Sequence, residues 1–123
     1  MKLTLYTETF IDSAHQLRGY NGPCCNIHGH IWKLGIWIKG TEDQLDRVGI
    51  LYDFTRIKEI HNLLDHKFIN DIPPFNKVNP TAENLVMFIY NTLKNKSPEL
   101  LFKVRVYETP VGKETYCEGG DFE

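Results

Sequence analysis

The sequence predicts an α+β domain with the element order ββααββ, in which a four-stranded, mostly antiparallel sheet carries two helices on one face. Residues 30–39 (HIWKLGIWIK) and 101–108 (LFKVRVYE) alternate apolar and polar side chains, which is typical of strands with one buried face. Residues 53–66 and 81–97 instead repeat apolar side chains at helical spacing. Two further strand-like segments, one before residue 30 and one after residue 108, complete the order ββααββ and so give the fold class.

The composition is that of an ordinary globular protein and argues against several functional classes. Hydrophobic residues make up 41% and charged residues 24% of the 123 residues, and we expect a single domain, 1–123. The net charge of −2 argues against a nucleic-acid or anionic-membrane partner. We see no secretion signal and no apolar stretch near the ~20 residues of a membrane span. Three Cys, two of them adjacent, form a poor disulfide framework, so we expect a cytoplasmic protein.

Two strands precede the first helix. Residues 2–12 (KLTLYTETFID) are rich in Thr and aromatic side chains with partial alternation, and residues 30–39 form a second, stronger strand. A polar, charged loop follows at 40–49. The outer strands of such a sheet have unpaired edges, which proteins usually cover or pair with another subunit, so we expect an oligomer.

The helices are bounded by recognisable caps. The first runs through DFTRIKEIHNLLDH (53–66), with Asp53 as N-cap. Its apolar positions are Phe54, Ile57, Ile60, Leu63 and Leu64. After a Pro-marked loop at 72–80, Thr81 opens the second helix, which ends at Ser97-Pro98. Its apolar face carries Leu85, Val86, Ile89 and Leu93. A strand at 101–108, a turn at 109–112 and a short strand at 113–119 complete the chain.

Ionisable side chains stand at the ends of the predicted apolar face. In the second strand, one parity consists of His28, His30, Trp32, Leu34, Ile36 and Ile38. In the third strand, Phe102, Val104 and Val106 are followed on that face by Glu108, while Lys103 and Arg105 face outward. A His-x-His pair is commonly just two strand-end histidines, and a strand-end Glu commonly faces solvent. Their coincidence at one end of one face favours a functional site.

The histidines suggest a metal site of one of two kinds. His28 and His30 present neighbouring imidazoles that suit Zn²⁺ at about 2.0–2.1 Å per bond. His15 continues the apolar parity of the first strand and could reach the same end of the face. Three His with an open fourth position are typical of catalytic zinc. The alternative is a closed structural site made of Cys24, Cys25, His28 and His30, although adjacent Cys point apart in extended backbone.

Other candidates for chemistry are the thiols and the end of the first helix. One of the two Cys is expected to be a small buried hydrophobe, whereas a thiol near Zn²⁺ would have a lowered pKa that suits a base or nucleophile. His66 is either a solvated cation at the helix end or a proton-transfer group oriented by Asp65. We interpret His61 as an exposed partner of Asp65.

Six motifs occur in order: F-I-D-S-A-H (10–15), C-x3-H-G-H (24–30), L-Y-D-F (51–54), L-D-H (64–66), N-P-T-A-E-N-L (79–85) and Y-E-T (107–109). Together they resemble the 6-pyruvoyltetrahydropterin synthase family over nearly the whole chain. The resemblance implies the tunnelling fold, in which ββααββ subunits form a barrel, typically stacked as a homohexamer with active sites between subunits. It also implies a zinc lyase acting on 7,8-dihydroneopterin triphosphate.

The resemblance further implies residue roles and a subtype. The roles are zinc ligands His15, His28 and His30; catalytic residues Cys24, Asp65 and His66; and pterin-binding residues Glu108, Thr109, Thr81 and Glu83. Three residues separate Cys24 from His28, as in bacterial 6-carboxytetrahydropterin synthases of the queuosine pathway, whereas animal 6-pyruvoyl enzymes have five. We therefore expect 6-carboxy-5,6,7,8-tetrahydropterin, acetaldehyde and triphosphate as products. The alternatives are a 6-pyruvoyl product or another pterin side-chain cleavage, and a non-catalytic structural-zinc module.

Two positions depart from the family pattern. Many relatives have Arg after the first His, where this chain has Gln16, and Arg18 could replace it in holding the triphosphate. Cys25 leaves a second thiol beside the expected reactive one, and packing is the only role we assign to it.

Overall fold

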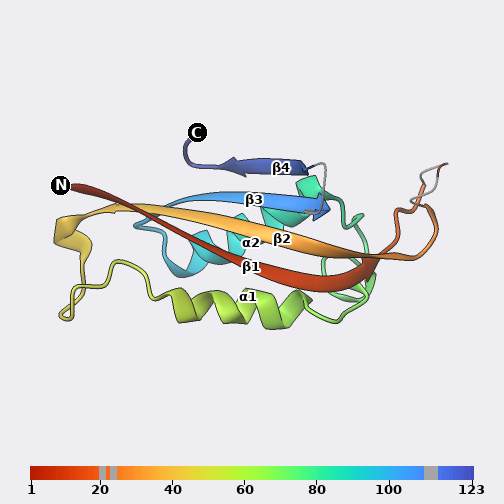
Figure 1. The fold of residues 1–123 in the computed structure, drawn as a ribbon, viewed down its shortest axis with the longest axis horizontal. Helices are drawn as coiled ribbons and strands as arrows, with labels where there is room; N and C mark the ends of the chain where they lie inside the picture. Colours follow the sequence, from red (N-terminus) through yellow and green to blue (C-terminus); the bar gives the residue numbers. More distant parts are fainter. Residues whose placement is uncertain (20–21, 23–24, 110–113) are drawn as a thin grey trace.

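The computed structural model describes residues 1–19, 22, 25–109 and 114–123, and it has the predicted α+β architecture (Figure 1). A four-stranded antiparallel sheet with the strand order β1-β2-β3-β4 carries two α-helices on one face. In Figure 1, α2 lies behind β3 and α1 runs along β1. The elements are β1 (Lys2–His15), β2 (His28–Thr41), α1 (Ile57–Leu64), α2 (Ala82–Lys96), β3 (Leu101–Thr109) and β4 (Thr115–Gly120).

The hairpin of β1 and β2 is longer than predicted and determines the position of the site. The two strands pair over 14 residues, from Lys2 opposite Thr41 to His15 opposite His28. The predicted strands, 2–12 and 30–39, were too short because their polar ends have weak strand propensity and are held by cross-strand pairing instead. This extension places His15 inside β1 and directly across from His28.

The core confirms the predicted parity of both central strands. Fully buried side chains of the sheet are Trp32, Leu34, Ile36, Ile38, Phe102, Val104 and Val106. Both helices pack their apolar faces on them. Phe54 and Leu63, however, are 46% and 41% exposed, so these two apolar positions of the predicted helix do not join the core. Phe54 lies in a short 3-10 turn before α1, and Leu64 takes the inward position beside Leu63.

The first helix is shorter than predicted at both ends, whereas the second has nearly the predicted bounds. Asp53 caps a 3-10 turn, Phe54–Arg56, by accepting a hydrogen bond from Thr55 N at 3.0 Å. Thr81 caps α2 as predicted, and its hydroxyl accepts from Asn84 N at 3.1 Å. Two further 3-10 turns, Glu42–Gln44 and Ile69–Asp71, were not predicted. None of the helices in the described ranges has both the length and the apolarity to cross a membrane.

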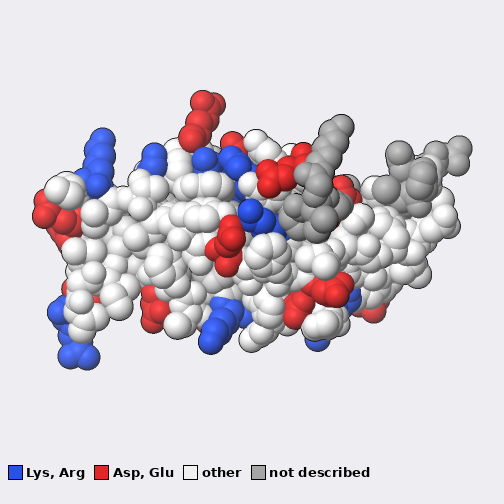
Figure 2. All heavy atoms as spheres, viewed as in Figure 1, with Lys and Arg blue, Asp and Glu red and all other residues white. Residues whose placement is uncertain are grey.

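The opposite face of the sheet carries aromatic and charged side chains. Lys103 and Arg105 point to this face, as predicted, and lie over the Trp37 ring at 4.2 and 4.9 Å from its centroid. Arg105 also pairs with Glu118 at 2.7 Å. Figure 2, viewed from the side away from α2, shows basic and acidic groups interspersed over the sheet. This face is therefore covered by paired charges rather than by apolar packing.

Core packing of β2 should dominate stability. Leu34 has no exposed surface, and Leu34→Ala should lower the free energy of unfolding by about 2–5 kcal/mol because a cavity remains. The matched change Leu63→Ala should cost less than about 0.5 kcal/mol, since this side chain is 41% exposed. Urea denaturation at one fixed protein concentration measures both, and equal losses would contradict the layer assignment.

Candidate active site

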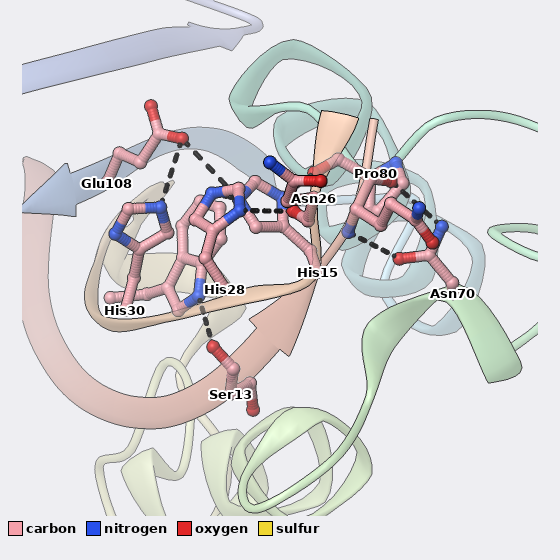
Figure 3. A network of polar contacts seen from close by, with 10 residues as sticks. Ser13, His15, Asn26, His28, His30, Asn70, Pro80 and Glu108 are labelled. Carbon is pink, nitrogen blue, oxygen red and sulfur yellow. Dashed lines mark hydrogen bonds and ion pairs between the residues drawn. The ribbon is translucent and has the colours of Figure 1, made fainter. Parts of the chain in front are cut away.

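Three histidines and one glutamate from three strands meet at one end of the helix-covered sheet face (Figure 3). His15 ends β1, His28 and His30 begin β2, and Glu108 lies next to the last residue of β3. One potential ligand atom from each residue lies within 4.8 Å of the others. The predicted convergence of the three histidines is thereby confirmed, and Glu108 joins them.

Backbone carbonyl groups fix the orientation of two of the rings. The Nδ1–H groups of His15 and His28 donate to the carbonyl oxygens of Pro80 and Asn26, each at 2.8 Å. Because a carbonyl oxygen only accepts, the proton of each neutral ring is on Nδ1 and the Nε2 lone pair faces the other histidine. The two Nε2 atoms are 2.9 Å apart. Two lone pairs at this distance repel unless a proton or a metal ion lies between them.

The inward nitrogen of the third histidine, His30, also needs a proton or a metal ion as its partner. The Nε2 atom of His30 is buried and has no hydrogen-bond partner among the described residues. A buried polar nitrogen without a partner carries a desolvation cost that a metal bond would remove. Three inward nitrogen donors of this kind suit a divalent ion such as Zn²⁺.

Burial keeps His15 and His30 in the form that binds metals. Burial lowers the pKa of His15, and the imidazoles of His28 and His30 lower it further, against the opposing effects of the Pro80 carbonyl and Glu108. Burial likewise lowers the pKa of His30, with Glu108 opposing and His28 adding to the shift. A neutral imidazole is the metal-ligating species, so the site is prepared for a cation at neutral pH.

Two further residues support this cluster: the sequence patterns placed Trp32 on the same strand face, and they did not reveal Asn70. Trp32 is fully buried beneath it, with ring centroids 4.8 Å from His15 and 5.2 Å from His30. Asn70 is 6% exposed and binds the backbone of Gln16 on both sides, accepting from its N at 2.9 Å and donating to its O at 2.9 Å. These contacts hold the end of β1, and so His15, in place.

The Asp65-His66 pair lies outside this cluster, at the outer side of β1. The Asp65 carboxylate accepts from Asp12 N at 2.8 Å, and its other oxygen is 3.4 Å from His61 Nε2 and 3.5 Å from His66 Nε2. The Asp12 N–H, followed by the two histidines, lowers the pKa of Asp65. The His66 side chain is 79% exposed, and its backbone has a left-handed φ of 53°. The predicted contacts of Asp65 with both histidines are confirmed.

The remaining predicted residues are placed in part. Cys24 lies outside the described residues, and so does the side chain of Thr109. Thr81 is the N-cap of α2 and comes directly after Pro80 in the sequence. The Pro80 carbonyl oxygen accepts from His15, so Thr81 is the sequence neighbour of a residue that contacts the cluster. Glu83 is exposed in the first turn of α2.

The two candidates for triphosphate binding are engaged within the chain. The side-chain amide of Gln16 donates to the Cys25 carbonyl at 2.8 Å. The Arg18 guanidinium donates to the carbonyl oxygens of Phe75, Asn76 and Val78 at 2.9–3.2 Å. Arg18 thus stabilises the loop before α2. Cys25 is not part of the described His/Glu group, which argues against the closed Cys/His site.

Comparisons with known proteins agree on one family. The sequence model named 6-pyruvoyl tetrahydropterin synthase matches residues 4–118. A 6-pyruvoyl tetrahydrobiopterin synthase from Drosophila melanogaster is 36% identical, over 72% of this chain and 58% of that protein. The 6-carboxy-5,6,7,8-tetrahydropterin synthases of Haemophilus influenzae and Bacillus subtilis are 30% and 32% identical, over 90% and 92% of this chain and 94% and 82% of theirs.

Solved structures show the same fold. A Caenorhabditis elegans 6-pyruvoyl tetrahydropterin synthase superposes with a TM-score of 0.76 at 22% identity, covering 99% of this chain and 97% of that one. A Plasmodium vivax 6-pyruvoyltetrahydropterin synthase gives 0.66 at 18% identity, covering 98% and 99%. The subunit fold predicted from the sequence is confirmed.

Acid should destabilise the metal-free protein through His15 and His30, whose pKa values are lowered in the folded state. Unfolded histidines have a pKa of about 6.5, and the folded values of His15 and His30 are lower. Below about pH 6.5 the unfolded state therefore binds more protons, and stability falls as the pH falls. Urea denaturation in EDTA between pH 7.5 and 5.5 should show this loss. At pH 7.5, chelation should leave the far-UV circular dichroism unchanged.

Variants identify the source of this pH dependence. His30→Gln should reduce it, whereas His61→Gln should retain it because His61 lies outside the His/Glu cluster. A stability that rises on acidification would contradict the assignment.

Proposed function

This protein belongs to the 6-pyruvoyl tetrahydropterin synthase family and has its tunnelling fold, and from this membership we propose that it is a zinc-dependent lyase. Its proposed reaction converts 7,8-dihydroneopterin triphosphate and water to 6-carboxy-5,6,7,8-tetrahydropterin, acetaldehyde and triphosphate. The observation that carries the proposal is the convergence of three inward imidazole nitrogens with Glu108. Two observations support the 6-carboxytetrahydropterin synthase subtype: three residues separate Cys24 from His28, and the relatives from Haemophilus influenzae and Bacillus subtilis are named 6-carboxy-5,6,7,8-tetrahydropterin synthase.

His15, His28 and His30 would hold the zinc through their Nε2 atoms. When bound, zinc supplies Lewis-acid activation of the substrate's side-chain oxygens and of the carbons next to them. The carbonyl partners of His15 and His28 keep these nitrogens free of protons and would leave their lone pairs available to a bound ion. The buried Trp32 beneath the rings excludes water from that side.

Glu108 is proposed to hold the pterin ring, with Thr109, Thr81 and Glu83 nearby. A carboxylate matches the donor edge of a 2-amino-4-oxo pterin through two charge-assisted hydrogen bonds. Glu108 has a side chain that is 32% exposed and stands beside the histidines, so a ring bound there would have its side chain close to the metal ligands.

Protons would be moved by Cys24 on one side and by Asp65 with His66 on the other. Because His66 is exposed and lies outside the cluster of its own chain, we propose that it serves the site of a neighbouring subunit. This arrangement requires a homo-oligomer, for which a hexamer is proposed. The chain would act as one domain, 1–123, in the cytoplasm, supplying queuosine or a related deazapurine.

A 6-pyruvoyl product is the second candidate. The relatives from Drosophila melanogaster and Dictyostelium discoideum, 36% and 35% identical, bear the name 6-pyruvoyl tetrahydrobiopterin synthase. The 6-carboxy and 6-pyruvoyl reactions would use the same substrate and the same metal-binding histidines. They differ in whether carbon atoms of the substrate's side chain are released as acetaldehyde.

The products of 7,8-dihydroneopterin triphosphate distinguish these candidates. Incubation with the purified protein should give acetaldehyde, triphosphate and a 6-carboxypterin, identified by mass. A 6-pyruvoyl product would overturn the subtype, and an unchanged substrate would overturn the proposed enzyme.

Replacement of each thiol tests which one reacts. Cys24→Ala should reduce turnover by at least about 10²-fold, the usual contribution of proton transfer, while bound zinc stays near one per subunit. Cys25→Ala is the matched control and should keep most of the activity. Metal content is measured alongside the rates. Loss of zinc from Cys24→Ala would contradict the assignment of Cys24 as a reactive thiol that does not bind the metal.

A further inference from the structure

Glu108 stands closer to the histidines than ring binding alone requires. Its Oε1 atom is 3.5 Å from His30 Nε2 and 3.7 Å from His15 Nε2 (Figure 3). Both separations exceed ordinary hydrogen-bond lengths, and His30 Nε2 has no hydrogen bond to any described residue. Within the described part of the chain, the carboxylate therefore approaches these rings without a hydrogen bond that would explain its position.

The distances from Glu108 to two of the histidines are instead close to those between ligands on one ion, and the four potential ligand atoms all lie within 4.8 Å of one another. In a tetrahedral zinc site with bonds of about 2.0–2.2 Å, two ligand atoms lie about 3.3–3.6 Å apart. The distances from Glu108 to His30 and His15 are close to this range. His15 and His28 are nearer to each other, at 2.9 Å, and would separate by about half an ångström around an ion.

Charge leads to the same arrangement. His15 directs a lone pair, not a proton, toward the cluster, because its Nδ1–H is held by Pro80. An anionic oxygen facing inward lone pairs is repelled unless a cation lies among them. Figure 3 shows one Glu108 oxygen directed at the rings and the other directed away.

We propose that Glu108 is the fourth metal ligand of the substrate-free protein, and that this carboxylate leaves the metal to hold the pterin ring. The second half of this proposal rests on the function proposed above. Paired hydrogen bonds to a pterin edge engage both carboxylate oxygens and align the carboxylate with that edge, so it turns away from the orientation in which Oε1 faces His15 and His30. At 32% exposure, the side chain has room to rotate away from the rings.

This exchange couples recognition of the ring to opening of the metal site. A ring that engages Glu108 would draw this carboxylate away and leave the fourth position open. A molecule without the pterin edge leaves Glu108 in place. By thermodynamic linkage, a bare pterin without a side chain and the metal should each weaken the binding of the other.

The first test measures metal binding without turnover. Co²⁺ affinity, from competition with a chelator, and the visible spectrum of the Co²⁺ protein are compared for wild type, Glu108→Gln, Glu108→Ala and the control Glu118→Gln. Glu118 has similar exposure, 34% against 32%, but pairs with Arg105 on the other face. Both Glu108 variants should bind Co²⁺ at least about tenfold more weakly, with a changed spectrum, and the control should match wild type. Wild-type affinity and spectrum in both Glu108 variants would overturn the ligand assignment; circular dichroism verifies their folding.

The second test adds 2-amino-4-oxopteridine, a ring without a side chain. It should change the wild-type Co²⁺ spectrum and weaken Co²⁺ binding, and should have neither effect in Glu108→Gln. Unchanged wild-type spectra at saturating pteridine, with binding shown by its fluorescence, would overturn the exchange. Absent turnover of dihydroneopterin triphosphate would show separately that the proposed lyase function is wrong. Weaker Co²⁺ binding with a changed spectrum in the Glu108 variants would still establish Glu108 as a metal ligand.

Discussion

The register of the β1–β2 hairpin is the constraint on which the site depends. It places His15 directly opposite His28 at the end of a 14-residue pairing. A slip of one residue would send the imidazoles of one strand to the opposite face, where Trp37 and the cationic side chains lie. The apolar alternation that buries Leu34 therefore also aims the histidines, since core and site share one periodicity.

The sequence patterns predicted the imidazoles and the carboxylate of the His/Glu cluster and missed the backbone groups that orient them. Strand parity was enough to place His28, His30 and Glu108 on one face, because alternation is a property of the chain itself. The carbonyls of Pro80 and Asn26, which orient the rings, left no signal, because every residue has a carbonyl group and only the fold selects which one is used.

The misplaced element ends have a similar cause. The strands were predicted too short because polar residues at the ends of β1 and β2 are held by cross-strand partners rather than by their own propensity. The first helix was predicted too long because helical spacing continues through Phe54 and Leu63, although neither is buried. Asn70 could have been suspected as a polar residue next to an apolar pair, but its partner, the Gln16 backbone, lies 54 positions away.

The contact between His15 and Pro80 has a consequence for how the protein acquires its cation. It joins positions 65 residues apart, and the remaining donors come from other strands. The three imidazoles lie within residues 15–30, but only the folded chain orients them through the Pro80 and Asn26 carbonyls and places Glu108 among them, so an ion bound here favours the folded state. Such an ion stabilises the native protein by mass action, in proportion to the logarithm of its concentration well above its dissociation constant. Metal supply in the surroundings would thereby help to determine how much of the chain persists in its native form.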